Sequence, residues 1–178
     1  DVSVYRPSNG TWYILDSQTG NFRAQQFGTA DDIVTVEDYD GDSRADVSVF
    51  RSSTGTWYTF GSINNAFSAI QFGTSGDIPV TGDFDGDRLG DQAVFRPSTG
   101  VWYIRNSNGG SVRAVGFGVD GDIPTAGDYD GDGKADISVY RPSTGTWYRL
   151  NSSDGSFAAV QFGLDGDIPV TGDYDGDG

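Results

Sequence analysis

The sequence predicts an all-β fold assembled from four tandem repeats, and three observations support this. Tryptophans recur every 45 residues, at Trp12, Trp57, Trp102 and Trp147. Phe-Gly pairs recur with the same spacing, at Phe27, Phe72, Phe117 and Phe162. The 27 glycines recur at fixed offsets with Asp, Ser and Thr, which is typical of short strands joined by tight turns. We expect a single repeat domain over residues 1–178, with repeats at 1–45, 46–90, 91–135 and 136–178.

Each repeat supplies four strands, which the second and third copies show most clearly. Runs rich in β-branched and aromatic residues predict strands over residues 77–84, 92–96, 101–105 and 111–117. The second and third of these strands are joined by Pro97-Ser98-Thr99-Gly100, in which Pro fixes φ and Gly relieves the exit from the turn. We therefore expect one small four-stranded sheet per repeat.

Apolar residues fall on both faces of the predicted strands, as for Trp147 on one face and Tyr148 and Leu150 on the other. A sheet that is apolar on both faces must be covered on both faces. Stacked four-stranded sheets of 40 to 50 residues satisfy this requirement, and they are typical of β-propeller blades. The alternatives are a sandwich, an open array or solenoid of the same sheets, and a part of a larger propeller.

Composition excludes several classes of function. The chain has no Cys, no His and no Met, which excludes disulfides, thiol nucleophiles and zinc sites of the usual kind. Its formal net charge is −15, with a single Lys (Lys134), so it repels phosphate backbones and nucleic acid is not an expected partner. It contains no apolar run long enough for membrane insertion.

Aspartate dominates the acidic residues, since Glu37 is the only glutamate. The motif Asp-x-Asp-Gly-Asp-x-x-x-Asp occurs three times, at Asp38, Asp40, Asp42 and Asp46; at Asp83, Asp85, Asp87 and Asp91; and at Asp128, Asp130, Asp132 and Asp136. A fourth copy begins at Asp173, Asp175 and Asp177, and Asp1 stands at the ninth position of a further loop. All sixteen are candidate metal ligands.

Four carboxylates within nine residues require a cation. Two such charges ~5 Å apart repel by ~3 kcal/mol even at an effective dielectric constant of about 20. Oxygens from alternate positions converge in a tight turn, and Gly at the fourth position lets the backbone bend. A numerous set of hard oxygen ligands favours Ca²⁺ over Zn²⁺ and Mg²⁺. We expect three complete Ca²⁺ sites; the alternative is a plain acidic β-turn.

The run from Gly166 to Gly178, Gly-Asp-Ile-Pro-Val-Thr-Gly-Asp-Tyr-Asp-Gly-Asp-Gly, together with the Phe-Gly pair at Phe162, resembles the FG-GAP or VCBS repeat family. The resemblance covers essentially the whole chain. It implies calcium held in the loop between the first two strands of each blade, in propellers such as those of integrin α-chains, secreted bacterial proteins and fungal lectins. Glu37, Val34 and the loop exit Arg88-Leu89-Gly90 are departures from the family pattern, and they fall in the first two loops.

The two ends of the chain are complementary, because Asp1 would supply the ninth ligand that the loop at Asp173 lacks. We expect these ends to pair, either by closing a four-bladed ring or with an adjoining segment of a longer array. Either arrangement would complete a fourth Ca²⁺ site.

The expected function is a non-catalytic, extracellular calcium-binding module, secreted or displayed at the cell surface, that acts as a structural or adhesive scaffold. Filament or surface-layer formation by self-association belongs to this interpretation. A lectin-like, glycan-binding propeller is the alternative, based on the repeated Trp-Tyr pair and on Arg6, Arg51, Arg96 and Arg141, although tryptophans at equivalent strand positions are more typical of core. An enzyme is not expected, because the aspartates are accounted for as ligands. The least uniform segments are the first place to expect a protein or glycan ligand: 17–21, 62–65, 106–110 and 151–155.

Overall fold

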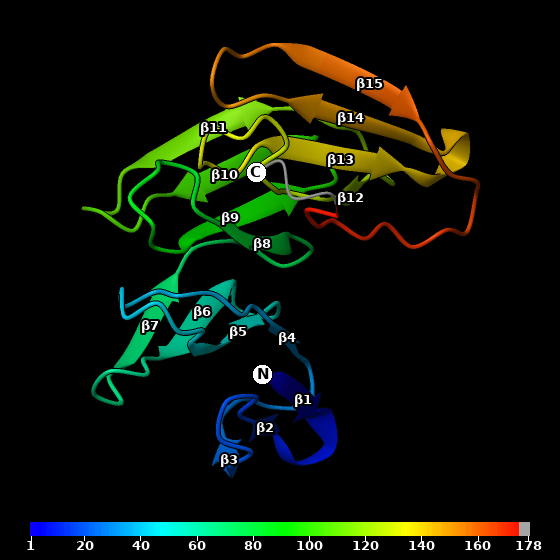
Figure 1. The fold of residues 1–178 in the computed structure, drawn as a ribbon. Coiled ribbons are helices and arrows are strands. Elements are labelled where there is room, and N and C mark those ends of the chain that lie inside the picture. The colour runs from blue at the N-terminus through cyan, green and yellow to red at the C-terminus, as the bar shows by residue number, and fades with distance from the viewer. Residues whose placement is uncertain (175–178) are drawn as a thin grey trace. The chain divides into compact units, whose positions relative to one another are not determined.

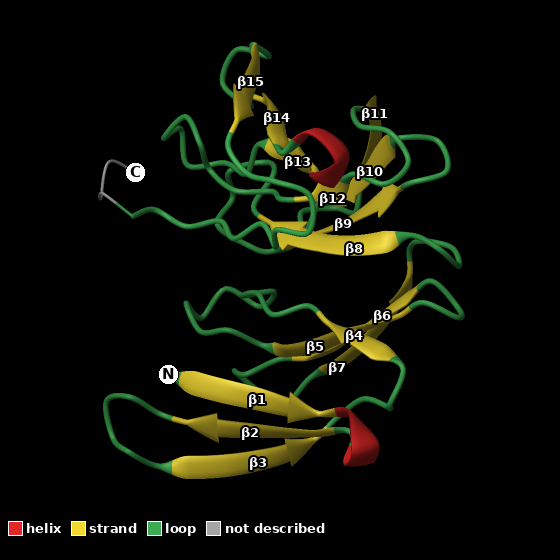
Figure 2. Cartoon of the chain, turned by 90° about the vertical axis from the view of Figure 1, so that its right-hand side faces the viewer, coloured by secondary structure: helices red, strands yellow, loops and turns green. Residues whose placement is uncertain are grey.

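The computed structural model describes residues 1–174, and this part of the chain is built almost entirely of antiparallel strands (Figures 1 and 2). It divides into two compact units, residues 1–75 and 76–178, and each is described by itself. The all-β class predicted from the sequence is confirmed. The single repeat domain over residues 1–178 stays a prediction.

The first unit contains two sheets, one of three strands and one of four. The three-stranded sheet consists of β1 (Val2–Arg6), β2 (Thr11–Leu15) and β3 (Phe22–Gln26). The four-stranded sheet consists of β4 (Asp32–Val34), β5 (Val47–Arg51), β6 (Thr56–Phe60) and β7 (Phe67–Gln71). Neighbouring strands follow one another along the chain, so each sheet is a meander.

The second unit contains two four-stranded sheets of the same order. One consists of β8 (Ile78–Gly82), β9 (Asp91–Arg96), β10 (Val101–Arg105) and β11 (Val112–Gly116). The other consists of β12 (Ile123–Pro124), β13 (Ile137–Arg141), β14 (Thr146–Leu150) and β15 (Phe157–Gln161). The four strands predicted over residues 77–117 are confirmed, each within three residues of its expected ends. Short 3-10 turns, Pro7–Asn9 and Pro142–Thr144, occupy two of the predicted Pro-Gly turns.

Each four-stranded sheet takes its first strand from the end of one 45-residue repeat and its other three strands from the next repeat. Ile78, for example, pairs with Phe95 across the boundary at residue 90. The sheet of β1, β2 and β3 has no such first strand among the described residues. The predicted four strands per sheet are therefore present in three sheets and incomplete in this one.

A core lies between the two sheets of each unit. In the first unit Trp12 and Ile14 of β2 pack against Val47 and Val49 of β5. In the second unit Trp102 and Ile104 of β10 lie in one cluster with Ile137 and Val139 of β13. The same strand positions therefore supply the two sides of both cores, which is why apolar residues recur on both faces of the strands.

The Trp and Phe-Gly repeats are explained by one contact. The indole Nε1 of Trp102 donates to the carbonyl oxygen of Phe117 at 2.9 Å, and the other three tryptophans bond the Phe fifteen residues later in the same way. The amide of Phe117 in turn donates to the carbonyl oxygen of Gly100 at 2.8 Å. Gly100 has φ +65° and touches the backbone of Gly118, so a side chain there would collide with the Phe-Gly pair. This contact fixes the outer strand against the turn.

An ion pair joins the first and second strands of each four-stranded sheet. Asp32, Asp77 and Asp122 are buried and accept two hydrogen bonds each from Arg51, Arg96 and Arg141, at 2.7–2.9 Å. Each guanidinium also lies over a tyrosine ring of the third strand, as Arg96 lies 4.4 Å from the ring centre of Tyr103. Within residues 1–174, no helix has the length and apolarity needed to cross a membrane.

Candidate metal centres

The three complete aspartate loops lie between the first two strands of the three four-stranded sheets. Pairing of these strands closes each loop, because the ninth aspartate stands opposite the residue that precedes the first one. Asp91 pairs with Gly82 inside the β8–β9 ladder, while Asp46 pairs with Glu37 and Asp136 with Gly127 as isolated bridges. The twelve predicted ligands of these loops are thus held at the same end of their sheets.

In each loop the structure brings three carboxylates together, with one oxygen of each lying within 4.8 Å of the others. These groups are Asp38, Asp40 and Asp42; Asp83, Asp85 and Asp91; and Asp128, Asp130 and Asp136. The fourth aspartate of each loop is bound to neighbouring groups instead. Asp87, for example, accepts hydrogen bonds from the amide of Leu89 and the hydroxyl of Ser107. Each loop therefore holds a cluster of three carboxylates, and their role as metal ligands stays a prediction.

The ninth aspartates are the most buried carboxylates of the loops. Asp91 accepts backbone hydrogen bonds from Ser107 at 2.6 Å and from Phe84 at 2.9 Å, and Asp46 and Asp136 are bound in the same way. Burial, together with the negative charge of Asp40, raises the pKa of Asp46; burial and the charges of Asp85 and Asp83 raise that of Asp91. These carboxylates therefore lie where added positive charge would be favourable.

The third position of the loop has an oxygen with no hydrogen-bond partner. Oδ1 of Asp40 and Oδ1 of Asp130 are buried and unpaired within residues 1–174, whereas their Oδ2 atoms accept bonds from Ile63 and Ser153. A buried carboxylate oxygen without a partner is costly, and a bound cation would satisfy it. The donor set consists only of hard oxygens and fits Ca²⁺ better than a transition metal.

Each aspartate loop is bound by a serine, and this serine lies in one of the segments that vary most between repeats. The residues are Ser17, Ser62, Ser107 and Ser152, which are 45 residues apart. The amide of Ser62 binds Asp46 and its hydroxyl binds Asp42, at 2.7 Å each, and Ser107 and Ser152 make the equivalent bonds. The 45-residue spacing was the signal that could have identified them. Each variable segment therefore contacts its ninth aspartate through a serine that is present in all four repeats.

The sixth position of each loop requires a left-handed backbone. Ser43, Arg88 and Gly133 occupy it with φ of 64°, 70° and 84°. Only Gly adopts this conformation without steric cost. The third loop has Gly at this position, whereas the first two loops hold Ser43 and Arg88 in the same backbone conformation at a steric cost.

The predicted fourth site is only partly described. Asp173 lies in the described part of the chain, while Asp175 and Asp177 lie outside the described residues. Asp1, the candidate ninth ligand, accepts hydrogen bonds from the amide and the hydroxyl of Ser17 at 2.8 and 3.0 Å. Its carboxylate is therefore held by the same serine contact as Asp46, Asp91 and Asp136. Completion of this site by Asp1 stays a prediction.

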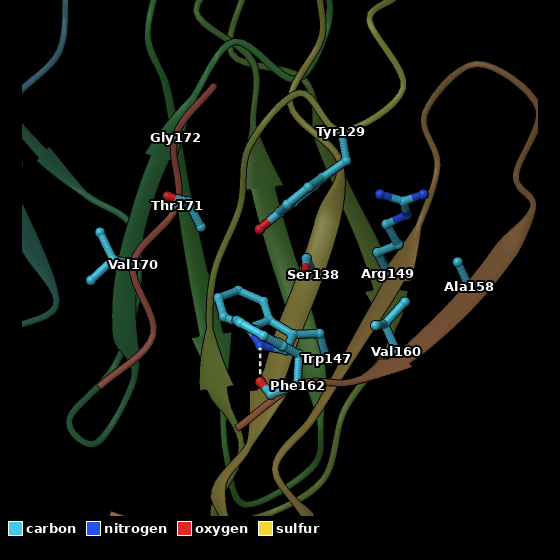
Figure 3. Close-up of a pocket in the computed structure, with 10 residues that line it drawn as sticks. All are labelled: Tyr129, Ser138, Trp147, Arg149, Ala158, Val160, Phe162, Val170, Thr171 and Gly172. Atoms are coloured by element: carbon cyan, nitrogen blue, oxygen red, sulfur yellow. Dashed lines mark hydrogen bonds between the residues drawn. The ribbon is translucent and has the colours of Figure 1, made fainter. Parts of the chain in front are cut away.

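The tryptophans belong mainly to the core. Trp12, Trp57 and Trp102 are buried, which favours the core interpretation over stacking on sugars. Trp147 differs, because it lines an apolar pocket of about 310 Å³ on the β12–β15 sheet together with Val160, Phe162 and Arg149 (Figure 3). Figure 3 also shows Val170 and Thr171 of the C-terminal segment on the other side of this pocket.

Comparison with known proteins supports the fold alone. No protein-family model matches the chain, and no curated protein matches it. Among solved structures, the crystal structure of BBS1N in complex with ARL6DN, soaked with lead, superposes with a TM-score of 0.51 and 11% sequence identity. The match covers 90% of this chain and 58% of that one, so the chain spans less than two thirds of its length. The architecture is therefore all-β and β-propeller-like.

Proposed function

We propose that the chain is a non-catalytic calcium-binding module of FG-GAP or VCBS type, which acts outside the cell as a structural or adhesive scaffold. The observation that carries the proposal is the unpaired, buried oxygen of Asp40 and Asp130 within a cluster of three carboxylates. A divalent cation would pair these oxygens and offset the mutual repulsion of the cluster.

Calcium would act on the junction between sheets as well as on the loops. In the second unit the amide of Ala135, in the last loop, donates to the carbonyl oxygen of Asp83, in the preceding loop, at 2.6 Å. Ala135 and Phe84 also belong to the core between the two sheets. An ion that fixes either loop would therefore fix the contact between consecutive sheets. We propose that these sheets are blades of a β-propeller, either closed or part of a longer array.

The proposed extracellular setting assumes calcium sites of low affinity. Extracellular calcium sites commonly have dissociation constants of about 0.1–1 mM, which match the millimolar calcium outside cells. A module with such sites would be loaded and rigid there. The aspartates act in this proposal as metal ligands, so the proposal assigns none of them to acid–base catalysis.

The test is calcium titration with thermal melting, with and without chelator. We expect about three Ca²⁺ per chain and a higher melting temperature with calcium, since a ligand at about 100 times its dissociation constant adds about 2.7 kcal/mol per site. Asp130→Asn should remove one ion, because it takes a charge from one cluster. Asp120→Asn, at an exposed aspartate outside the loops, is the matched control and should bind as the parent chain does. Equal melting temperatures in calcium and in chelator would contradict the proposal.

A further inference from the structure

We propose that Asn108 is a site of spontaneous covalent modification, at which the side-chain amide is lost as ammonia and a mixture of aspartate and isoaspartate is formed. This modification goes beyond the proposed function, because the reaction needs only the polypeptide and water and does not involve a metal ion. It adds one negative charge to a chain whose formal net charge is −15.

The reaction requires an asparagine whose side chain can be reached by the backbone amide of the next residue. That amide nitrogen attacks Cγ of the asparagine, the bond from Cγ to the side-chain nitrogen breaks, and ammonia leaves as a five-membered succinimide ring closes. One water molecule then opens the ring at either carbonyl, which gives aspartate or isoaspartate. Glycine at the next position favours the attack, because it has no Cβ and the widest range of backbone conformations.

The sequence offers two candidates for this reaction. Of the seven asparagines, only Asn9 and Asn108 are followed by glycine. Two others, Asn106 and Asn151, are followed by serines whose amides donate to buried aspartates at 2.6 Å each. Those amides are fixed away from the asparagine side chain. The structure then separates the two Asn-Gly pairs.

Asn108 lies where the structure permits the attack. Asn108 and Gly109 are exposed in the turn between β10 and β11. Among residues 1–174, neither the side chain of Asn108 nor the amide of Gly109 has a hydrogen-bond partner. A Cβ placed on Gly109 would meet no atom within 4 Å. The amide nitrogen and the side-chain carbonyl therefore have room to approach each other.

The turn that holds Asn108 is also closed by fewer hydrogen bonds than two equivalent turns. In the turns at 16–21 and 151–156, the fifth residue is a glycine whose amide donates to the first carbonyl oxygen, at 2.8 and 3.0 Å. The described part of the chain shows no such bond from Gly110 to Asn106. Gly109 and Gly110 both have left-handed φ, of 76° and 67°. A turn with few backbone hydrogen bonds opens at a low free energy, which favours cyclisation.

Asn9 is held in a geometry that prevents the attack. Gly10 is buried, and its amide donates to the carbonyl oxygen of Pro7 at 3.3 Å. The side-chain nitrogen of Asn9 donates to the hydroxyl of Tyr13 at 3.3 Å. A side chain on Gly10 would collide with the backbone of Gly28, so the amide lies in a closely packed contact. Cyclisation at Asn9 must therefore wait for this contact to open.

The Asp-Gly pairs inside the aspartate loops are protected as well. Aspartate can form the same ring with loss of water, but its ionised carboxylate is a weaker electrophile than an amide. In the three complete loops the amide of this glycine donates to the first aspartate of the loop, at 2.6–2.8 Å. The nitrogen that would attack is held within each loop. We therefore expect the modification outside the candidate metal ligands.

Deamidation would add its charge beside the second aspartate loop. Residue 108 is equivalent to Ile63 and Ser153, which lie 45 residues before and after it. The amide of Ile63 donates to Asp40 at 3.0 Å, and the hydroxyl of Ser153 donates to Asp130 at 2.6 Å. By this equivalence a carboxylate at position 108 lies near Asp85. It would strengthen cation binding by the second loop, and this part alone rests on the proposed calcium function.

The test follows the full chain during incubation at mildly alkaline pH, by peptide mapping and mass spectrometry with chromatographic separation of aspartate from isoaspartate. We expect both products at Asn108, with release of one ammonia per modified chain. Modification at Asn9 should be at least about tenfold slower, because it requires local opening. In denaturant the two Asn-Gly pairs should react at similar rates, since only the folded structure distinguishes them. No modification of Asn108, or equal rates at Asn9 and Asn108 in the folded chain, would overturn the proposal.

Variants separate the modification from its effect on metal binding. Gly109→Ala should slow the reaction, because the added Cβ disfavours the left-handed backbone, while Asn108→Gln should abolish it without a change of charge. In calcium titration, Asn108→Asp should strengthen one site by about two- to threefold relative to Asn108→Gln, as expected for one exposed charge in salt. Equal affinities would refute the effect on the loop and leave the modification intact. A chain that modifies Asn108 but binds no calcium would refute only the proposed function.

Discussion

Residues 77–82 and residues 167–172 are the same six amino acids in two different structures. In the first segment residues 78–82 form β8, and the buried side chain of Asp77 is bound to Arg96. In the second segment no strand forms, and Asp167 is exposed. The local sequence is therefore not what makes the strand. The difference lies in whether a second strand stands beside the segment, which agrees with the strong dependence of strand formation on context.

The proline of the segment is consistent with this role. Pro79 has no N–H to donate, and β8 is the edge strand of its sheet, where such a donor is not required. A first strand with this sequence is stabilised by pairing with one neighbouring strand, as β8 pairs with β9, and by the ion pair between Asp77 and Arg96. Comparisons between equivalent residues that differ in how they are covered or paired extend this contrast, and the largest effect is expected in the core.

Trp102→Ala should cost far more than Trp147→Ala, because Trp102 is fully covered by the next sheet and Trp147 faces the open pocket. We expect a loss of about 3–5 kcal/mol in the free energy of unfolding for Trp102→Ala, which is usual for removal of a buried aromatic ring. Trp147→Ala should lose roughly half as much or less, since part of its surface is already in water. Denaturant unfolding of the full chain, followed by circular dichroism, measures both losses. Equal losses would contradict the assignment of the Trp147 face as uncovered.

Much of the fold could be predicted from the repeat spacing. The strands, the turns and the position of the aspartate loops between first and second strands follow from Trp102, Phe117 and their equivalents, because a 45-residue period leaves no freedom in the register. The exposure of individual valines could not be predicted, since Val2 and Val47 stand in the same sequence pattern. Val47 is buried because Trp12 and Ile14 of the preceding sheet pack against it, whereas Val2 is exposed.

The site was predicted less completely than the fold. The aspartates were identified by their charge density, but Ser62 and Ser107 were hidden in segments whose other residues vary. The sequence also could not show which three carboxylates of a loop converge. Asp42 and Asp87 both accept a serine hydroxyl, yet only Asp42 belongs to the cluster of its loop, so the repeated motif alone does not determine the set.

Arg51→Met should destabilise the first unit, whereas Arg6→Met should have little effect. Removal of Arg51 leaves the buried carboxylate of Asp32 unpaired, which commonly costs about 3 kcal/mol. Arg6 is exposed and has no carboxylate partner among residues 1–174, so only its contact with Tyr13 is lost. Denaturant unfolding at pH 7 in the presence of chelator provides the comparison.

The ion pair between Asp32 and Arg51 predicts that the free energy of unfolding depends on pH. Burial alone would raise the pKa of Asp32, but hydrogen bonds from Arg51 and Thr29 outweigh burial, so the pKa is lowered. A lowered carboxyl pKa gives stability that is present above the ordinary aspartate value and is lost as the pH falls through the lowered value. The difference in unfolding free energy between the parent chain and Arg51→Met should therefore shrink between pH 7 and about pH 3. A difference that stays constant over this range would contradict the role of the Asp32 charge.

The smallest effect is expected at the serines. Ser107→Ala removes the hydroxyl donor to Asp87 and should cost about 1 kcal/mol without calcium, because one partly buried hydrogen bond is lost. Ser17→Ala, in the incomplete sheet, removes a bond to the exposed Asp1 and should cost less than half of that. With calcium the gap should widen if Ser107 positions a ligand, since a displaced Asp87 would weaken binding of the ion in its loop. Calorimetric titration of both variants would show this as one weakened site in Ser107→Ala and unchanged sites in Ser17→Ala. If both serines weaken binding equally, the loop and not the completeness of the sheet decides how the carboxylates are held.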